Sequence, residues 1–156
     1  MIRPATPADV PTVLQLIRDL AAYERDPDAV KATEATLHDA LFGSPPAAEA
    51  VLAEIDGRAV GVALFFFNFS TWTGKRGLYL EDLFVGEAAR GAGVGKALLR
   101  HLAQVAIDRD CARFEWAVLD WNAPAIGFYK SIGAVAMDGW TIMRVEGEAL
   151  RALASG

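Results

Sequence analysis

Three glycines at alternate positions between two cationic residues form the segment of this sequence best suited to chemistry. The segment reads Arg90, Gly91, Ala92, Gly93, Val94, Gly95 and Lys96. Glycines remove the side chains that would keep backbone N–H groups from converging on an anion. A helical pattern begins at Val94, and a helix start adds unpaired N–H donors and the positive end of the helix dipole. The segment predicts a pyrophosphate site, with positive charge supplied by Arg90 and Lys96.

Two familiar phosphate-binding loops do not match this turn. A nucleotide-triphosphate loop would need one more residue after Gly91, and Ala97 replaces the hydroxyl residue that would hold magnesium. The dinucleotide fingerprint needs a glycine three places after Gly93, where Lys96 stands. A glycine-rich turn between a strand and a helix that binds no ligand stays open as an alternative.

Two adjacent acids form the second unusual feature. Glu81 and Asp82 interrupt an otherwise apolar stretch at residues 78–85, which predicts a central strand. Charged groups in a central strand are costly unless they are paired or functional. Adjacent strand residues point to opposite faces, so both acids can share one face only if the strand contains a bulge. We therefore expect Glu81 to bind a cation, with Asp82 assisting from the other face or forming a structural hydrogen bond.

The spacing of apolar residues predicts the elements that must position these groups. Helices are expected over residues 6–21, 36–42, 94–106 and 124–132. Strands are expected from Ile2 and over residues 51–55, 59–67, 78–85, 114–119, 134–137 and 140–145, the last two as a closing hairpin. The order β-α-α-β-β-β-α-β-α-β-β predicts a mixed α/β fold, a central mixed sheet flanked by helices in one domain spanning residues 1–156.

Composition limits the class of protein further. The 156 residues carry a net charge of -5, which argues against nucleic-acid binding and suits a cationic ligand. The single cysteine, Cys111, the absence of a signal-peptide pattern and the lack of a long apolar run predict a cytoplasmic protein. His38 and His101 stand far apart and no Cys/His cluster has metal-ligand spacing, so no metal is expected.

The glycine turn and further short motifs together resemble the GNAT acetyltransferase superfamily. Arg90-x-x-Gly93-x-Gly95 is similar to its pyrophosphate signature. Nearly the whole chain is similar to the spermidine/spermine branch, which includes enzymes acting on thialysine. The matching segments are residues 2–6, 23–24, 79–82, 84–85, 121–122, 124, 128–130 and 139–140. The resemblance implies an N-acetyltransferase that uses acetyl-CoA and a small cationic amine, and a homodimer whose two subunits shape the acceptor pocket.

The resemblance also implies roles for individual residues. The turn from Gly91 to Lys96 would hold the pyrophosphate, and the strand edge of Leu83, Phe84 and Val85 would receive the pantetheine arm and the thioester carbonyl. Asn122, Pro124 and Ala125 would add cofactor contacts. Tyr129 would protonate the departing thiolate, a transfer that requires close positioning because a phenol near pKa ~10 is the weaker acid; an aromatic packed under the helix is the alternative.

The acceptor amine would be bound by acids, because an alkyl ammonium with pKa near ~10.4 must lose its proton before it attacks. Glu81 would bind it and relay that proton through water. Tyr23 and Glu24 match an acceptor-binding loop, although Glu24 could equally be a solvated residue. Trp116 either lines the acceptor site or packs in the core. Asp138 could reach a distal amine, but three residues are missing before it relative to the family.

One departure from the branch narrows the expected substrate. Thr71 stands where the polyamine enzymes carry an acid before the central strand. Each lost carboxylate weakens recognition of a remote amine, so we expect a diamine or a thialysine-like amino acid in preference to spermine. Two other functions stay open: a catalytically silent acyl-CoA-binding regulatory module, and an acetyltransferase of protein N-termini or lysines.

Overall fold

The computed structural model describes residues 1–156 and contains a five-stranded mixed sheet in the order β1-β2-β3-β4-β5. The strands are β1 (Ile2–Pro4), β2 (Glu49–Ile55), β3 (Arg58–Ser70), β4 (Lys75–Val85) and β5 (Arg113–Trp116). The first four pair antiparallel along the sheet, and β5 joins β4 in parallel. A mixed sheet flanked by helices, as the sequence predicts, is confirmed.

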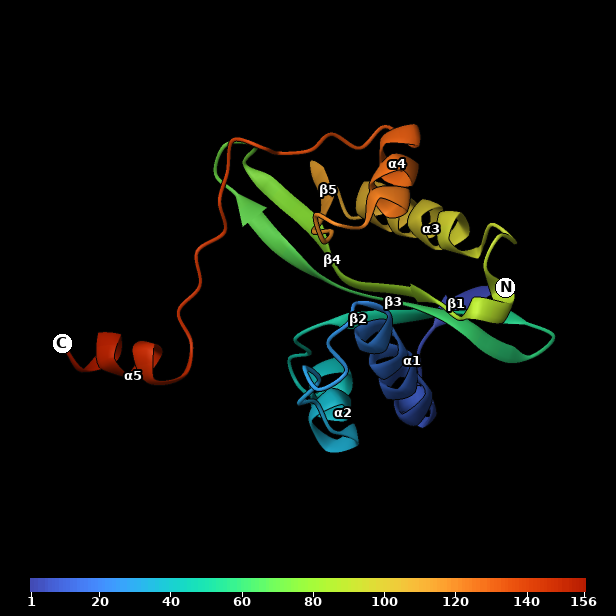
Figure 1. Ribbon diagram of the computed structural model, residues 1–156, viewed down its shortest axis with the longest axis horizontal. Coiled ribbons are helices and arrows are strands. Elements are labelled where there is room, and N and C mark those ends of the chain that lie inside the picture. The colour runs from blue at the N-terminus through green and yellow to red at the C-terminus, as the bar shows by residue number, and fades with distance from the viewer. The chain divides into compact units, whose positions relative to one another are not determined.

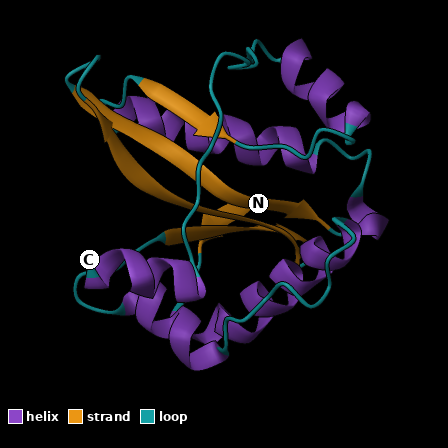
Figure 2. Cartoon of the chain, turned by 60° about the vertical axis from the view of Figure 1, so that its left-hand side comes forward, coloured by secondary structure: helices purple, strands orange, loops and turns teal.

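Helices cover both faces of this sheet (Figures 1 and 2). They are α1 (Val10–Tyr23), α2 (Glu34–Phe42) and α3 (Val94–Asp108), with short 3-10 turns η1 (Pro7–Asp9) and η2 (Glu87–Ala89). In Figure 1, α1 and α2 lie on one side of the sheet and α3 lies on the other. The chain therefore forms a three-layer arrangement of helix, sheet and helix within residues 1–119.

The start of the chain is fixed by side chains that the sequence marks as a helix start. The Asp9 carboxylate accepts hydrogen bonds from the N–H and the hydroxyl of Thr6 at 2.7 and 2.8 Å. Arg3 on β1 donates to both Asp9 and Glu54, at 2.7 and 2.8 Å. The Arg3 hydrogen bond is the main cause that holds the pKa of Asp9 below its ordinary value. These contacts tie β1 and η1 to the end of β2.

Two apolar layers separate the sheet from its helices. On one face, Val62, Leu64 and Phe84 pack into a cluster with the buried side of α1, including Val13 and Leu14. On the other face, a Cβ placed on Gly61 would lie 3.4 Å from the side chains of Val94 and Leu98, so β3 approaches α3 closely there. Each fully buried aliphatic side chain contributes roughly 1.5–3 kcal/mol. The two layers therefore hold β3 and β4 firmly between α1 and α3.

Residues 120–156 form a second compact unit, which is described by itself. It contains α4 (Ala123–Ser131), close to the helix expected from Pro124, and α5 (Gly147–Ser155) at the C-terminus. The predicted closing hairpin over residues 134–137 and 140–145 is wrong: a turn forms at Asp138 and Gly139, but neither flank is a strand. Figure 2 shows this segment as a loop.

The physical reason for this difference lies in the segment's lack of a strand to pair with. An isolated two-stranded hairpin is marginally stable in water, and Ala134 and Ala136 add little β-propensity. Residues after Gly147 are rich in Ala, Leu, Glu and Arg, which favour a helix. No element is predicted for these last residues above, although their composition favours the helix α5.

Candidate active site

A β-bulge in β4 brings the two strand acids into one region. Leu64 of β3 pairs with Asp82 and the next residue, Phe65, pairs with Leu80, so Glu81 is the extra residue on β4. The expectation that Asp82 lies on the face opposite Glu81 assumed an unbroken alternation, which a bulge interrupts. Bulges redirect side chains and occur often beside active sites. The adjacent acids that look anomalous in the sequence thus mark an irregular position in the strand.

Three carboxylates lie close enough to influence one another at this bulge. The pKa of Asp82 is raised to about 6, chiefly by burial and then by the negative charges of Glu81 and Glu24. Glu24 follows the last residue of α1, and burial raises its pKa as well. The Asp82 side chain forms no hydrogen bond or ion pair, so the structural hydrogen bond offered as an alternative for it is not observed. An acidic cluster of this kind favours a cation and can accept a proton near neutral pH.

Tyr79 is a member of this cluster that the sequence analysis missed. Its pKa is raised by burial first, and then by the charges of Glu81 and Glu115. Its ring lies 5.2 Å from the ring of Phe66, centroid to centroid. The sequence signal for it was its spacing of two residues from Glu81, because residues i and i+2 of a regular strand point to the same face.

The glycine turn has the backbone geometry that an anion site requires. Gly91 and Gly93 adopt φ values of +82° and +77°, and a Cβ at either would meet no atom within 4 Å. The first N–H in α3 with a helical partner is that of Ala97, which donates to the Gly93 carbonyl at 2.9 Å. The preceding N–H groups of Val94, Gly95 and Lys96 are therefore free of intrahelical bonds. An open, side-chain-free backbone at a helix start fits a diphosphate.

Arg90 connects the glycine turn to both neighbouring elements. Its Nε donates to the Val85 carbonyl at 3.1 Å. Its guanidinium carbon lies 4.9 Å from the ring centroid of Tyr23 and 5.6 Å from that of Phe84. Tyr23 ends α1 and is 43% exposed, whereas Phe84 is buried in the core. A residue predicted for the donor site thus also contacts the predicted acceptor loop.

The edge of β4 beside the acidic cluster is open. The parallel ladder between β4 and β5 ends at the pair of Leu80 with Trp116. Residues 81–85, which include Leu83, pair with β3 alone. Alternate backbone N–H and C=O groups of such a stretch point away from the only neighbouring strand and can bind a ligand. The strand edge predicted to receive the pantetheine arm is therefore unpaired on the side that a ligand needs.

Trp116 lies on the sheet face away from the acidic cluster. Its partner on β4 is Leu80, and the partner of Leu80 on β3 is Phe65. Leu64 packs against α1, so the next residue, Phe65, points to the opposite face, and Leu80 and Trp116 share that face with it. The Trp116 ring lies 5.0 Å from that of Phe114 in an edge-to-face arrangement. This position favours packing over a role in the acceptor site.

The second unit holds the remaining predicted residues. Asn122 is buried and caps α4, its side-chain oxygen accepting from the Ala125 N–H at 3.4 Å, and Pro124 lies in the first turn. Tyr129 is half-buried on α4, with its ring 5.7 Å from that of Phe128. Asp138 lies in an exposed turn. Their assignment to cofactor, catalysis and substrate stays a prediction.

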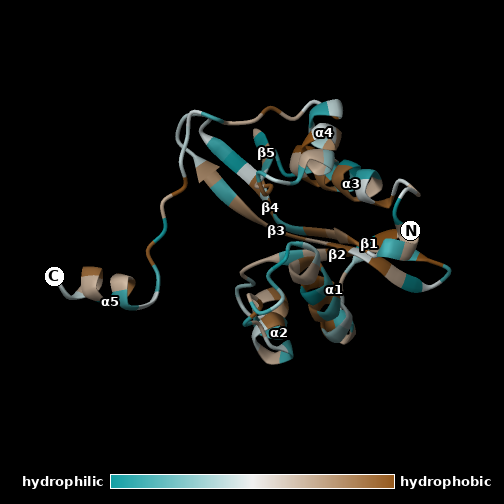
Figure 3. Ribbon diagram, viewed as in Figure 1, coloured by the Kyte–Doolittle hydropathy of each residue, from teal (hydrophilic) through white to brown (hydrophobic).

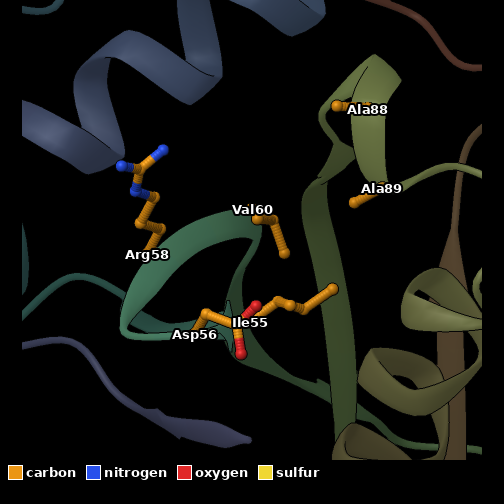
Figure 4. Close-up of a pocket in the computed structure, with 6 residues that line it drawn as sticks. All are labelled: Ile55, Asp56, Arg58, Val60, Ala88 and Ala89. Atoms are coloured by element: carbon orange, nitrogen blue, oxygen red, sulfur yellow. The ribbon is translucent and has the colours of Figure 1, made fainter.

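Within residues 1–119, a shallow hollow of about 390 Å³ lies between the β2–β3 turn and η2 (Figure 4). It is lined by Ile55, Asp56, Arg58, Val60, Ala88 and Ala89. It contains no predicted site residue and no cluster of titratable groups. The acidic cluster, the open β4 edge and the glycine turn therefore form the stronger candidate site.

Together these features define a class of protein. A glycine turn at a helix start can hold a diphosphate, an unpaired strand edge can hold an extended arm, and acids beside that edge can bind a cation and take its proton. This combination is that of a transferase joining a phosphate-bearing donor to a cationic acceptor. None of the helices is long and apolar enough to span a bilayer, and no group of three or more His, Cys, Asp or Glu is arranged to hold a metal ion.

Comparison with known proteins identifies the family. The model of the acetyltransferase (GNAT) family matches residues 13–134. A thialysine N-epsilon-acetyltransferase of Sus scrofa is 41% identical, with 99% of this chain and 96% of that protein covered. The L-ornithine N5-acetyltransferase NATA1 of Arabidopsis thaliana is 33% identical, with 97% and 86% covered. The solved structure of an integron cassette protein from V. cholerae has a TM-score of 0.84 and 29% identity, with 100% and 98% covered.

The chain therefore belongs to the GNAT acetyltransferase family. The predicted family, mixed α/β fold and enzyme class are confirmed. Members of this family use acetyl-CoA as cosubstrate, and the open backbone at Gly91 and Gly93 fits its diphosphate.

Proposed function

We propose that this enzyme transfers an acetyl group from acetyl-CoA to a primary amine of a short cationic molecule, such as a diamine or a thialysine-like amino acid. The observation that carries the proposal is the acidic cluster of Glu24, Glu81 and Asp82 beside the open edge of β4. A cluster of carboxylates favours an ammonium group, and their closeness suits one short cation. The thialysine and ornithine enzymes among the relatives act on amines of this kind by their names.

The roles of the residues follow from this placement. The turn from Gly91 to Lys96 would hold the diphosphate through backbone N–H groups, and the edge at residues 83–85 would orient the thioester. Glu81 would bind the ammonium and relay its proton through water. Asp82, with a pKa of about 6, would share that proton at a pH where an ordinary Asp holds none.

Transfer would occur directly between the two bound substrates. The neutral amine nitrogen would attack the thioester carbonyl carbon, and the carbon–sulfur bond would break as Tyr129 gives its phenolic proton to the departing thiolate. The proton that the nitrogen loses as the amide forms would pass through water and restore the Tyr129 phenol. A backbone N–H of the β4 edge aimed at the developing oxyanion would contribute ~3 kcal/mol to the transition state. No acyl-enzyme forms, which agrees with the lack of a nucleophile motif around any serine.

Thiol-release kinetics with acetyl-CoA over a panel of amines would test this function. The panel should contain thialysine, ornithine, short diamines, spermidine, spermine and a peptide library. We expect the highest kcat/KM with a short amine, a large loss of kcat in Tyr129→Phe, and a loss with Glu81→Gln that the exposed helix variant Glu34→Gln does not show. A far higher kcat/KM for spermine would contradict the substrate class, and preference for peptides would favour a protein acetyltransferase.

The same assay separates an enzyme from a silent module. Acetyl-CoA binding by calorimetry without thiol release from any amine would support the acyl-CoA-binding regulatory alternative. Wild-type kcat in Tyr129→Phe would remove the acid role of that residue. A cytoplasmic location, one domain over residues 1–156, and contacts of Asp138 with substrate stay predictions.

We also propose a homodimer. The segment before α5 exposes large apolar side chains, including Val135, Ile142 and Met143 at 80%, 79% and 86%. Its ribbon contains brown, hydrophobic stretches (Figure 3). β5 is the last strand of the sheet and has one paired edge, and open edges accept added strands. Analytical ultracentrifugation should give twice the mass of one chain, and Ile142→Lys should shift the protein toward monomer, whereas Thr141→Lys, on the other side of an extended segment, should not. A monomer in the wild type at micromolar concentration would contradict the proposal.

A further inference from the structure

The parallel pairing of β5 with β4 places one more acid beside the candidate acceptor site. Glu115 of β5 pairs with Tyr79 of β4, and Tyr79 pairs in turn with Phe66 of β3. Paired residues of neighbouring strands point to the same face of a sheet. The pKa of Tyr79 is raised by burial and then by the charges of Glu81 and Glu115, so both acids lie close to its phenol. A half-buried carboxylate of β5 therefore lies beside the Phe66 and Tyr79 rings.

The register of the sheet gives the separation of Glu115 from the acid after the bulge. Asp82 pairs with Leu64 of β3, and Tyr79 pairs with the residue two positions further along β3, so both point to the same face. Two residues along a strand and one strand across amount to about 8 Å between the backbone positions of Asp82 and Glu115. In extended thialysine the reactive amine and the α-amino group are also about 8 Å apart, by ordinary bond lengths. One amine can thus lie at Asp82 while the other lies at Glu115.

A cation lies next to Glu115 on the same face of the sheet. Arg113 comes two residues earlier on β5, is exposed and pairs with Gly77 of β4. The four residues of β5 pair with β4 without a shift in register, so Arg113 and Glu115 point to one face. Neither side chain forms a hydrogen bond or an ion pair with the other or with a third residue. Each can therefore bind a separate charged group of a ligand.

We propose that Glu115 and Arg113 recognise the α-amino acid end of the acceptor: Glu115 binds the α-ammonium group and Arg113 binds the α-carboxylate, while the reactive amine lies at Glu81 and Asp82. This inference rests on the function proposed above. It narrows the substrate class to a lysine-like amino acid whose α-amino and carboxylate groups are both free. Glu115 and Arg113 determine specificity and do not touch the reacting atoms.

The chemistry of this face favours an amino acid over the other acceptors. A guanidinium pairs with a carboxylate through two parallel hydrogen bonds, which gives the contact a defined geometry. The Phe66 and Tyr79 rings, 5.2 Å apart, offer apolar surface to the chain between the two ends of the acceptor. A diamine would bring its second ammonium group beside Arg113, where like charges repel. A lysine within a peptide has neither free end group and would leave both side chains without a partner.

The expected selectivity follows from the strength of such contacts. A hydrogen-bonded charge pair at a partly exposed position corresponds to about 5- to 10-fold in binding. These contacts lie away from the thioester and are the same in the ground state and in the transition state. Their loss should therefore raise KM and leave kcat within about 2-fold of the wild type.

Thiol-release kinetics with three acceptors that share one reactive end would test the assignment. They are thialysine, the diamine that remains without its carboxylate, and the acid that remains without its α-amino group. Arg113→Met should lower kcat/KM for thialysine and the acid by about 5- to 10-fold, and leave that for the diamine unchanged or higher. Glu115→Gln should lower kcat/KM for thialysine and the diamine by the same factor, and leave that for the acid unchanged or higher.

Two kinds of control accompany these variants. The acceptor that each variant leaves unaffected shows that the variant is folded and active. Arg18→Met on α1 and Glu34→Gln on α2 remove exposed charges elsewhere, and should leave the ratios of kcat/KM between the three acceptors as in the wild type.

The outcomes distinguish this inference from the proposed function. Absence of thiol release with every amine would contradict the function, and the inference with it. Release with a higher kcat/KM for the diamine than for thialysine in the wild type would overturn the inference alone. Equal losses with all three acceptors would also overturn it, because such a loss does not depend on the end group. Unchanged kinetics in both variants would do the same, and would leave the two charges the role of protecting a sheet edge.

Discussion

Replacing Asp82 by asparagine should make the protein more stable at neutral pH and less active. Asp82 has a pKa of about 6 in the folded protein, raised from 3.8 by burial and by the charges of Glu81 and Glu24. Since the unfolded chain releases this proton first, wild-type stability falls as pH rises from about 4 to 6 and stays lower above that range. The carboxylate is thus a cost to the fold at the pH where the enzyme would use it.

The difference between the two pKa values sets the magnitude. About two pH units at about 1.4 kcal/mol each give up to about 3 kcal/mol at pH 7 and above. Asp82→Asn removes the charge and keeps the size, so its free energy of unfolding should exceed that of the wild type by up to this amount at pH 8. At pH 4 Asp82 is protonated in the folded protein and about half ionised in the unfolded chain, so the two proteins should differ by less than about 1 kcal/mol.

Urea unfolding at pH 4, 6 and 8, followed by circular dichroism, would measure this gap. Glu34→Gln, which removes an exposed carboxylate from the first turn of α2, controls for the loss of one charge and should show no gain in stability at pH 8, because that carboxylate is favoured by the helix dipole. Equal stability of Asp82→Asn and wild type at pH 8, or a gap of the same size at pH 4, would refute the reasoning. Equal stability at pH 8 would mean that Asp82 is hydrated or paired in solution, whereas a gap independent of pH would mean that the amide itself stabilises the fold.

Four further predictions test the fold around the site. Gly93→Ala should lower stability by about 1–2 kcal/mol in thermal unfolding and weaken acetyl-CoA binding, because φ is +77° there. Arg3→Met should lower the unfolding midpoint at pH 7, and the difference should shrink as pH falls below about 4, because the unfolded chain then binds the Asp9 proton while Arg3 still keeps the folded Asp9 ionised. Phe65→Ala, at a side chain 2% exposed, should cost about 3–5 kcal/mol in urea unfolding. Asn122→Ala should cost about 1 kcal/mol through the lost cap of α4, measured in the same way.

Local patterns predict most of the sheet and its helices. The helical spacing after Val94 and the apolar strand at residues 78–85 both correspond to observed elements, α3 and the second half of β4. β3 and β4 extend toward each other beyond the expected ends, so that a four-residue turn replaces most of the loop expected at residues 68–77. The polar residues of this segment do not show an apolar strand pattern, although the ends of β3 and β4 that they form are stabilised by pairing with each other.

The sequence predicts which residues belong to the candidate site better than it predicts how they are arranged. The glycine turn and the acid pair stand out by residue type alone. The bulge at Glu81, the end of the β4–β5 ladder at Leu80 and the stacking of Arg90 on Tyr23 depend on neighbouring strands and helices, and no local pattern encodes them. The closing hairpin failed for the same reason, because a strand exists only with its partner.

The extra residue at Glu81 has a consequence for how such a site can arise. Leu80 and Asp82 pair with consecutive residues of β3, so removing Glu81 would leave an unbroken ladder with every apolar side chain still on its present face. The insertion of a single residue is thus enough to add an acidic group to the middle of a sheet without repacking the interior. Sequences that differ by one gap at this position should therefore share the scaffold and differ in chemistry.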